Sequence, residues 1–265
     1  MITKLSLKLI PNEEIQLSGL GGETLYGLFL NLLKAQDSKL ASSLHNARET
    51  KPITLSPFVS GVELRDGKVI LEPGSKAYFE ISFFTDPPAE AFMLGLNKAL
   101  GNIEPVNLGG KEVKLASPKI AKVTNFKELE NKTKPQSQIT LRFLSPTSFR
   151  SHGDQRVFPE PNFVFSSLLK KWNAFSSIKF PKGLEDEFTK IRVSRYNTRT
   201  ELVEFSNYKI IGFKGNVTYE LPKGISDEAK KQINTLTDFA FYAGVGYKTT
   251  MGMGSVDYLT MRNCR

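Results

Sequence analysis

Hydrophobic and polar positions predict a regular succession of elements in the first half of the chain. Leu5, Leu7 and Leu9 stand at every second position of residues 2–10, which predicts a strand with one buried face. Residues 24–35 carry apolar side chains at helical spacing, and residues 38–44 predict a further helical piece. Asp66-Gly67 separates two alternating runs, which predicts a hairpin. The other predicted elements are strands over 52–58, 62–71, 77–84 and 112–124 and a helix over 90–100.

The second half repeats this order. Strands are predicted over 138–149, 191–205, 208–221 and 255–261, and helices over 162–175 and 227–243. Each half therefore follows the order strand, helix, strand, strand, helix, strand. This indicates an α+β chain of tandem ferredoxin-like (RRM-like) domains. We expect the domains at residues 1–125 and 138–265, joined by a polar linker over 126–137.

This fold class leaves the function open, and composition narrows it only partly. RNA binders, small-molecule sensors and metabolic enzymes all use ferredoxin-like domains. The chain has 265 residues, with 36 Lys and Arg against 27 Asp and Glu, so its formal net charge is 36 − 27 = +9. That excess favours a polyanionic partner, nucleic acid first, although basic residues that only solvate the surface would give the same count.

Several function classes are disfavoured by the same composition. A hydrophobic content of 40% argues against a disordered chain. The longest apolar runs are too short to span a membrane, and the N-terminus lacks a signal-peptide pattern, so we expect a cytoplasmic protein. Cys264 is the one cysteine and the chain has two histidines, so we expect no metal site and no cofactor.

The sharpest local feature is a glycine-rich run over residues 244–254. It follows a predicted helix and precedes a predicted strand, which is the opposite order to a dinucleotide-binding or P-loop motif. Its backbone N–H groups, Lys248, Thr249 and Thr250 could bind a phosphate chain. Alternatively, the glycines serve only close packing of a helix against a sheet. The sequence leaves both interpretations open.

Two further basic groups stand in the second half. Arg192, Arg195 and Arg199 lie in one predicted strand with Tyr196 between them, a composition that suits RNA phosphates and bases. The alternative is an exposed strand edge that is protected by charge. Lys170-Lys171 lie towards the end of the 162–175 helix, where we expect them to interact with the helix dipole.

The glycine-rich run resembles the C-terminal signature of the RAMP superfamily and, more narrowly, of the Cas6 family of CRISPR endoribonucleases. Residues 239–249, 144–150, 163–172 and 212–215 are also similar to that family. The resemblance implies cleavage of CRISPR repeat RNA in precursor crRNA. The 2′-OH would attack the adjacent phosphate without a metal, giving a 2′,3′-cyclic phosphate and a 5′-OH. It also implies a CRISPR effector complex as a partner, and leaves monomer and homodimer open. The alternative is a catalytically inactive RNA-binding subunit of such a complex.

The resemblance also implies roles for individual residues. His45 lies just after the first helical region, as the family's catalytic histidine does, and Lys51 follows at a similar spacing to a transition-state lysine. Tyr26 lies nineteen residues before His45, so it is either a third member of this set or a core residue. His152 is the second choice of catalytic base. RNA contacts are expected from Gly244, Gly246, Lys248, Thr249, Gly252, Gly254, Arg150, Arg192, Arg195 and Arg199.

Overall fold

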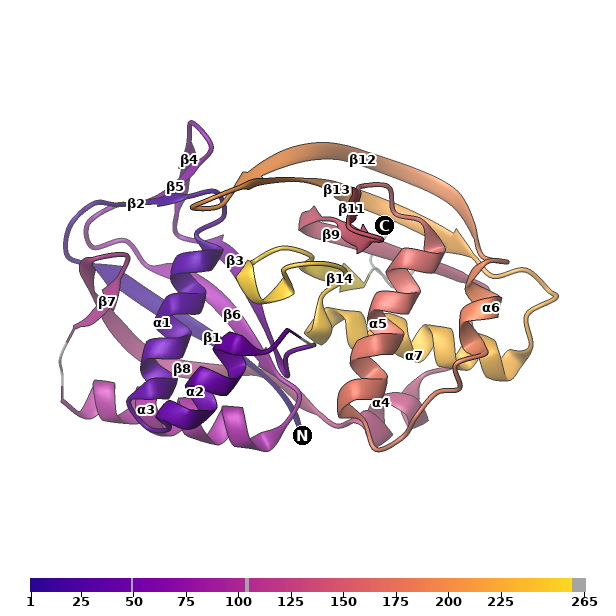
Figure 1. Cartoon of the computed structure of the whole chain (residues 1–265), viewed down its shortest axis with the longest axis horizontal. Coiled ribbons are helices and arrows are strands. Elements are labelled where there is room, and N and C mark those ends of the chain that lie inside the picture. The colour runs from indigo at the N-terminus through magenta and orange to yellow at the C-terminus, as the bar shows by residue number, and fades with distance from the viewer. Residues whose placement is uncertain (49, 103–104, 259–265) are drawn as a thin grey trace. The chain divides into compact units, whose positions relative to one another are not determined.

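The computed structural model describes residues 1–48, 50–102 and 105–258, which form two compact units. The N-terminal unit comprises residues 1–123 together with the short segments 203–209 and 250–252. The C-terminal unit comprises residues 124–202 and 210–249 and the chain from 253 onwards. Figure 1 labels most elements of both. Two short segments of the second half thus belong to the first unit. The predicted division into 1–125 and 138–265 assigns these segments to the second domain.

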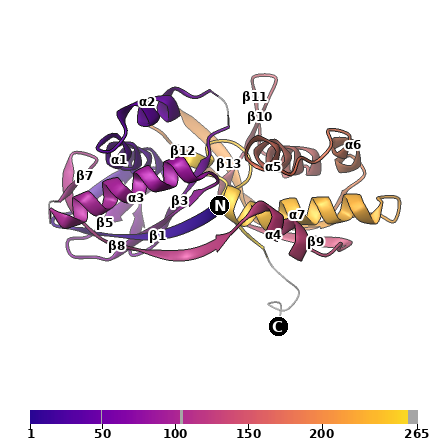
Figure 2. The same cartoon turned by 90° about the horizontal axis from the view of Figure 1, so that it is seen from below.

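The N-terminal unit is built on a five-stranded sheet of order β3-β6-β1-β8-β7, with a smaller sheet of order β2-β5-β4. Counted along the chain, the four long strands lie in the order 2-3-1-4, which is that of a ferredoxin-like unit. Helices α1 and α3 lie on one face of this sheet (Figure 2). The elements are β1 (Ile2–Pro11), β2 (Ile15–Ser18), α1 (Gly22–Lys34), α2 (Ser38–Asn46), β3 (Ile53–Ser60), β4 (Glu63–Arg65), β5 (Lys68–Leu71), β6 (Ala77–Phe83), α3 (Asp86–Gly101), β7 (Val106–Leu108) and β8 (Lys111–Thr124).

Strand alternation places the core of this unit between the sheet and its helices. The buried Leu5, Leu7 and Leu9 of β1 pair in register with Ile81, Phe79 and Ala77 of β6. The aromatic rings of Phe29, Phe83 and Phe92 cluster between α1, β6 and α3. This packing fixes α1, which carries one of the predicted site residues.

The C-terminal unit has a four-stranded sheet of order β12-β13-β9-β14, again 2-3-1-4 along the chain. Tandem ferredoxin-like folding is therefore confirmed. A short hairpin of β10 and β11 precedes helix α5. The elements are α4 (Phe126–Lys132), β9 (Gln138–Thr147), β10 (Phe149–Ser151), β11 (Asp154–Arg156), α5 (Pro161–Phe175), α6 (Leu184–Phe188), β12 (Arg192–Glu204), β13 (Lys209–Glu220), α7 (Asp227–Ala243), the 3-10 turn η1 (Thr249–Met251) and β14 (Val256–Tyr258).

Part of the polar segment that we expected to be a linker forms a helix, α4. Its Asn125 cap accepts a hydrogen bond from the Glu128 backbone at 2.8 Å. Its Phe126 ring packs edge-on against Trp172 and also contacts Phe239. One aromatic side chain therefore attaches a mostly polar segment to the core of the C-terminal unit, which a polarity pattern does not reveal.

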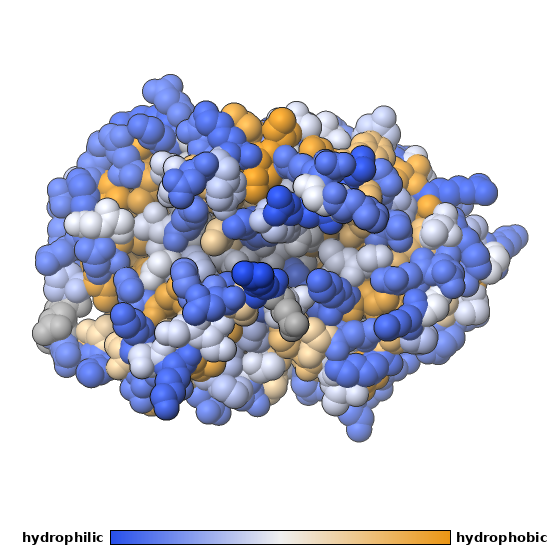
Figure 3. Space-filling view, in the orientation of Figure 1, coloured by the Kyte–Doolittle hydropathy of each residue, from blue (hydrophilic) through white to orange (hydrophobic). Residues whose placement is uncertain are grey.

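Short elements were missed more often than long ones. The sequence pattern does not predict β2, β7, α6 or the β10–β11 hairpin, and α3 begins at Asp86 rather than at residue 90. The predicted last strand continues to residue 261, but residues 259–265, with Cys264, lie outside the described residues. Hydrophilic side chains cover much of the face shown in Figure 3, with apolar ones interspersed. Among the described residues, no helix combines the length and apolar character of a membrane span.

Candidate active site and glycine-rich loop

Tyr26, Lys51 and the backbone at His45 form one hydrogen-bonded cluster in the N-terminal unit. Helix α1 places the Tyr26 ring in the core, 4% exposed and 6.0 Å from the Phe29 ring. The Tyr26 hydroxyl donates to the Leu44 carbonyl at 3.2 Å and accepts from Lys51 Nζ at 2.8 Å. Its single proton is committed to Leu44, so towards Lys51 the oxygen acts as an acceptor. Tyr26 is therefore a core residue that also contacts Lys51, and its place in a catalytic set stays a prediction.

Lys51 is held at three points. Besides its bond to Tyr26, Lys51 Nζ donates to the His45 carbonyl at 3.2 Å and lies 5.0 Å from the Tyr26 ring centroid. That carbonyl belongs to the last turn of α2, where the helix dipole favours a cation. Burial raises the pKa of Tyr26 to about 12, so the phenol is neutral at neutral pH. The cluster therefore holds one fixed positive charge beside a neutral hydroxyl.

The imidazole of His45 is exposed on α2, whose backbone is fixed at both ends. Asp37 caps the N-terminus by accepting from the Leu40 backbone at 2.9 Å, and Lys51 contacts the C-terminal turn. An imidazole can accept or donate a proton, and an ammonium can stabilise a developing negative charge. Residue 49, between the two, lies outside the described residues. Within the described part of the chain, no group of three or more His, Cys, Asp or Glu side chains could hold a metal ion.

The glycines of the 244–254 loop are explained by tight packing inside each unit. A Cβ at Gly246, which has φ +82°, would overlap the Ser148 carbonyl oxygen, and a Cβ at Gly254, with φ +70°, would overlap that of Val245. Within the N-terminal unit, a Cβ at Gly252 would press against Pro57. The packing interpretation of these glycines is thus supported directly.

Much of the loop backbone is already hydrogen-bonded to protein. The N–H groups of Val245, Tyr247 and Gly254 donate to Gly254, Ser148 and Pro146 carbonyls, and that of Gly246 donates to Ser167 Oγ at 3.1 Å. These N–H groups are therefore bonded within the fold, which favours the packing interpretation of the two that the sequence leaves open.

A buried lysine, Lys171 of α5, organises the base of this loop. Its Nζ donates to the carbonyls of Ala243 and Gly244 at 2.6 and 3.2 Å and to Thr249 Oγ1 at 2.9 Å. Thr249, predicted as an RNA donor, is buried and accepts from Lys171 instead. We expect Lys171 to interact with the dipole of its own helix, but in the structure it interacts with the end of α7. Sequence reasoning missed this role because a buried lysine looks the same in sequence as an exposed one.

Two cations flank one ring at the outer part of the loop. Lys248 Nζ lies 5.4 Å and the Arg150 guanidinium carbon 5.3 Å from the Tyr247 ring centroid. Lys248 adopts φ +58°, an unusual backbone conformation for a lysine. The structure therefore brings together the predicted residues Lys248 and Arg150, and adds Tyr247, which was not among the predicted residues.

The remaining predicted residues lie elsewhere in the C-terminal unit. Arg192, Arg195 and Arg199 are all exposed on the edge strand β12, and Arg199 forms an ion pair with Glu201 at 3.0 Å. Exposure suits both interpretations of this strand, RNA contact and edge protection. His152 lies at the exposed tip of the β10–β11 hairpin with φ +53°, and its Nδ1 is 3.0 Å from Ser151 Oγ. It therefore belongs to a different unit from the Tyr26–Lys51 cluster.

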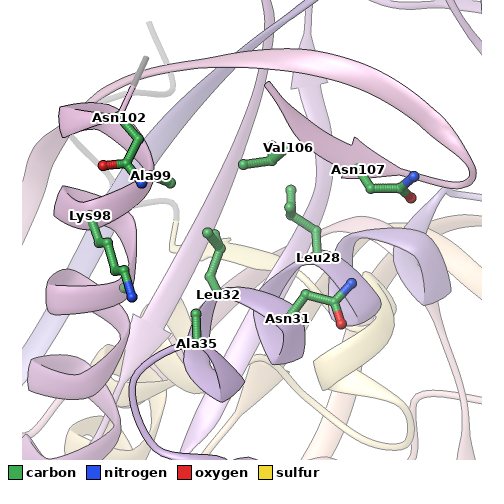
Figure 4. A pocket seen from close by; sticks show the side chains of 10 residues that line it. Leu28, Asn31, Leu32, Ala35, Lys98, Ala99, Asn102, Val106 and Asn107 are labelled. Carbon is green, nitrogen blue, oxygen red and sulfur yellow. The ribbon is translucent and has the colours of Figure 1, made fainter. Parts of the chain in front are cut away.

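A pocket of about 260 Å³ opens between α1, α3 and β7, with Lys98 and several asparagines around an apolar floor (Figure 4). It contains none of the predicted site residues. Leu28 and Leu32 line it from one face of α1, and Ala35 lines it at the C-terminal cap of that helix. Tyr26 is two residues before Leu28, roughly 200° away around the helix. The pocket and the Tyr26–Lys51 cluster therefore use different faces of the same helix.

Comparison with known proteins places this chain in one family. The family model "CRISPR-associated endoribonuclease Cas6" matches residues 141–256, and "CRISPR Cas6 N-terminal domain" matches residues 1–85. The fold is of the class found in RAMP proteins, since a RAMP protein binding different RNA substrates has a TM-score of 0.65 at 16% identity. The chain belongs to the Cas6 family.

Individual relatives agree with this assignment. A Cas6 of Streptococcus thermophilus is 26% identical over 133 residues, 49% of this chain and 54% of the relative, so the match spans about half of that protein. A Cas6 of Mycobacterium tuberculosis is 31% identical over 45% of this chain and 38% of the relative. A solved Cas6 product complex has a TM-score of 0.83 at 27% identity, covering 98% of this chain and 100% of that one. A Thermus thermophilus Cas6 has a TM-score of 0.71 at 25% identity, covering 98% of both chains.

Proposed function

We propose that this chain is an endoribonuclease that cuts CRISPR repeat RNA, and so processes precursor crRNA, by a metal-independent reaction. The observation that supports this most directly is the Tyr26–Lys51–His45 cluster, which places a fixed cation next to the backbone of an exposed histidine. Family membership points to the same substrate, because the relatives carry the name CRISPR-associated endoribonuclease. One solved relative is a histidine-to-alanine mutant, and another is a substrate mimic complex.

Cleavage without a metal needs a base, an acid and a positive charge near the phosphorane. The base takes the proton of the 2′-OH, whose oxygen attacks the adjacent phosphorus. The bond to the 5′-oxygen breaks as the acid protonates that oxygen. His45 supplies proton transfer as the base or the acid. Lys51 stabilises the negative charge on the phosphorane, and Tyr26 positions Lys51. The products are a 2′,3′-cyclic phosphate and a 5′-OH, and no external oxidant or co-reactant is consumed.

The chain offers its own matched control for the role of His45, because it has only one other histidine. Cleavage of a labelled CRISPR repeat RNA should continue in EDTA. Removing a general acid or base costs roughly 10²–10⁴ in rate, so His45→Ala should lose cleavage by about that factor while still binding RNA. His152→Ala should cut at the normal rate.

Other results would contradict the proposal in distinct ways. Cleavage that stops in EDTA would rule out the metal-independent reaction. Normal cutting by His45→Ala would move the role to another residue. A repeat RNA with 2′-deoxyribose at the cut site should resist cleavage, and its cleavage would exclude attack by the 2′-OH. Binding without any product by the unmodified chain would favour an inactive RNA-binding subunit.

RNA would be held mainly by basic groups of the C-terminal unit. Lys248 and Arg150 lie close to the Tyr247 ring, and three exposed arginines lie along strand β12. Phosphate contacts of this kind release counterions, so affinity should fall steeply as salt rises. The proposed role of the 244–254 loop thus rests on its side chains at positions 247 and 248 rather than on the backbone N–H groups bonded within the fold.

A further inference from the structure

One face of helix α5 contacts the glycine-rich loop at two points. Ser167 and Lys171 are four residues apart and therefore lie on the same side of the helix. Ser167 Oγ accepts from the Gly246 N–H at 3.1 Å, and Lys171 Nζ donates to Thr249 Oγ1 at 2.9 Å. The two anchored loop residues, Gly246 and Thr249, enclose only Tyr247 and Lys248. Helix α5 thus restrains both ends of the two-residue segment that carries the loop's ring and charge.

Lys171 uses its full donor capacity in this arrangement. An ammonium has three N–H donors, and Lys171 directs them to the Ala243 carbonyl, the Gly244 carbonyl and the Thr249 hydroxyl. The two carbonyls stand at the C-terminal end of α7, where intrahelical partners run out. The side chain is 7% exposed, so ligands have little access to it. Such a residue acts on the fold around it rather than on a substrate.

The conformation between the two anchors is costly without them. Gly246 and Lys248 both have positive φ, +82° and +58°. A lysine in that region is disfavoured and persists only where its surroundings impose it. The Tyr247 N–H adds a third restraint by donating to the Ser148 carbonyl at 2.8 Å. These bonds fix the backbone conformation of the segment in which Tyr247 lies close to Lys248 and Arg150.

We propose that Lys171, assisted by Ser167, is a positioning residue for RNA binding: from within the core it sets the loop conformation that presents Lys248 and Tyr247 to the RNA backbone. This inference rests on the proposed function and extends it to a side chain that does not touch RNA. It predicts that removing Lys171 costs the same phosphate contact as removing Lys248, although only Lys248 meets the ligand.

The test measures the affinity for repeat RNA against salt, in the His45→Ala background so that the RNA stays uncut. The variants are Lys171→Met and Ser167→Ala, with the adjacent Lys170→Met and Ser166→Ala as matched controls. Losing one phosphate contact lowers the slope of log K against log salt by about 0.7–0.9. We expect that loss, with about a tenfold lower affinity, in Lys171→Met, a smaller loss in Ser167→Ala, and neither in the controls. In the Lys248→Met background, Lys171→Met should lower the salt slope no further, because the phosphate contact is already gone.

Two readouts separate loop release from unfolding. The chain has a single tryptophan, Trp172, which is buried and adjacent to Lys171, so its emission reports the surrounding core. Loop release should leave that emission unchanged while trypsin cuts faster after Lys248. A shift of the Lys171→Met emission to the red would mean that its core is disturbed. The test then uses Ser167→Ala, which removes a single anchor.

The proposal is overturned if a variant with native emission keeps full affinity and slope, or if its loss of slope adds fully to that of Lys248→Met. Failure of the proposed function looks different. In that case the unmodified chain binds no repeat RNA, whereas the trypsin rate at Lys248 still shows whether Lys171 holds the loop. An unchanged trypsin rate in folded Lys171→Met would overturn the positioning role itself.

Discussion

Two lysines of this chain have similar hydrogen-bond partners but differ in burial. Lys51 donates to the Tyr26 hydroxyl and to a carbonyl in the last turn of α2, and Lys171 donates to the Thr249 hydroxyl and to carbonyls at the end of α7. Lys51 is half-buried, whereas Lys171 is enclosed. A cation near solvent can act on the charge of a ligand, but an enclosed one acts on the backbone around it. We therefore expect similar contacts to serve catalysis in one unit and loop positioning in the other.

The largest effect that tests this difference is expected at Lys51. Lys51→Met removes the charge and leaves the unbranched stem. Losing one donor that stabilises transition-state charge costs about 10²–10³ in rate, and we expect that loss in single-turnover cleavage at saturating RNA. RNA affinity should change little, because one phosphate contact at most is lost. Quench-flow or gel-based time courses, with binding measured separately, give both numbers.

Lys39 provides the control for Lys51, since it is an exposed lysine on α2. Lys39→Met changes the net charge equally and should cut at the normal rate. If Lys51→Met lost affinity and rate in parallel, Lys51 would be a binding residue and the proposed contrast with Lys171 would fail.

The next effect concerns the packing around Lys171 rather than the lysine itself. Gly254→Ala places a Cβ against the Val245 carbonyl at a position with φ +70°. Strained backbone and overpacking each cost of the order of 1–3 kcal/mol, so the free energy of unfolding of the C-terminal unit should fall by about that amount. Urea denaturation followed by Trp172 fluorescence measures it.

Gly224→Ala is the matched control for Gly254→Ala. A Cβ added at Gly224 would meet no atom within 4 Å, and the backbone there has no positive φ, so the extra methyl group should be tolerated. Equal stability of the two variants would show that the loop repacks at little cost. The glycines would then be available for a direct RNA role after all.

Burial of Lys171 also predicts a pH dependence of stability. Burial lowers the pKa of Lys171 from its ordinary value of 10.5 to about 7. Between these values the unfolded chain binds a proton that the folded chain has lost, so the free energy of unfolding rises with pH above about 7. The contribution is roughly 1.4 kcal/mol per pH unit at most, and it levels off below the folded pKa.

Comparing variants isolates this contribution from other titrations. The free energy of unfolding of the unmodified chain should rise from pH 7 to pH 9 relative to that of Lys171→Met. Relative to that of Lys170→Met it should show no such rise. The pH range ends below the ordinary tyrosine pKa, because burial also raises the pKa of Tyr26 and Tyr242 to about 12. A difference that stays flat would mean that Lys171 keeps its proton throughout.

The same comparison shows what the sequence could and could not predict. Long periodic elements such as α7 were predicted at 227–243, because a 3.6-residue apolar pattern needs no partner to be visible. Tyr26 and Lys51 were selected through the family resemblance, yet their hydrogen bond joins residues 25 positions apart and no spacing rule predicts it. Lys171 was expected to interact with its own helix, because the chain does not reveal which lysine becomes enclosed.

The sequence pattern did not predict the short elements for a related reason. Helix α4 lies in a mostly polar segment, and its Phe126 contacts Trp172 and Phe239, which are far along the chain. The sequence leaves open whether the backbone of the 244–254 loop binds phosphate or serves packing, whereas in the structure Ser148, Ser167 and Pro146 from other elements accept its hydrogen bonds. Tertiary partners thus decided the points that local patterns left open.

The smallest expected effect distinguishes positioning from catalysis at Tyr26. Tyr26→Phe keeps the ring that stacks on Phe29 but removes the hydroxyl between Leu44 and Lys51. A typical hydrogen bond contributes about 0.5–1.5 kcal/mol, so cleavage should slow by roughly 2- to 12-fold, far less than in Lys51→Met. The pH–rate profile should keep its shape, because the phenol holds its proton at working pH. In the Lys51→Met background Tyr26→Phe should cost almost nothing in rate, since the cation it positions is gone. A 100-fold loss, or an equal loss in both backgrounds, would instead make Tyr26 a catalytic residue in its own right.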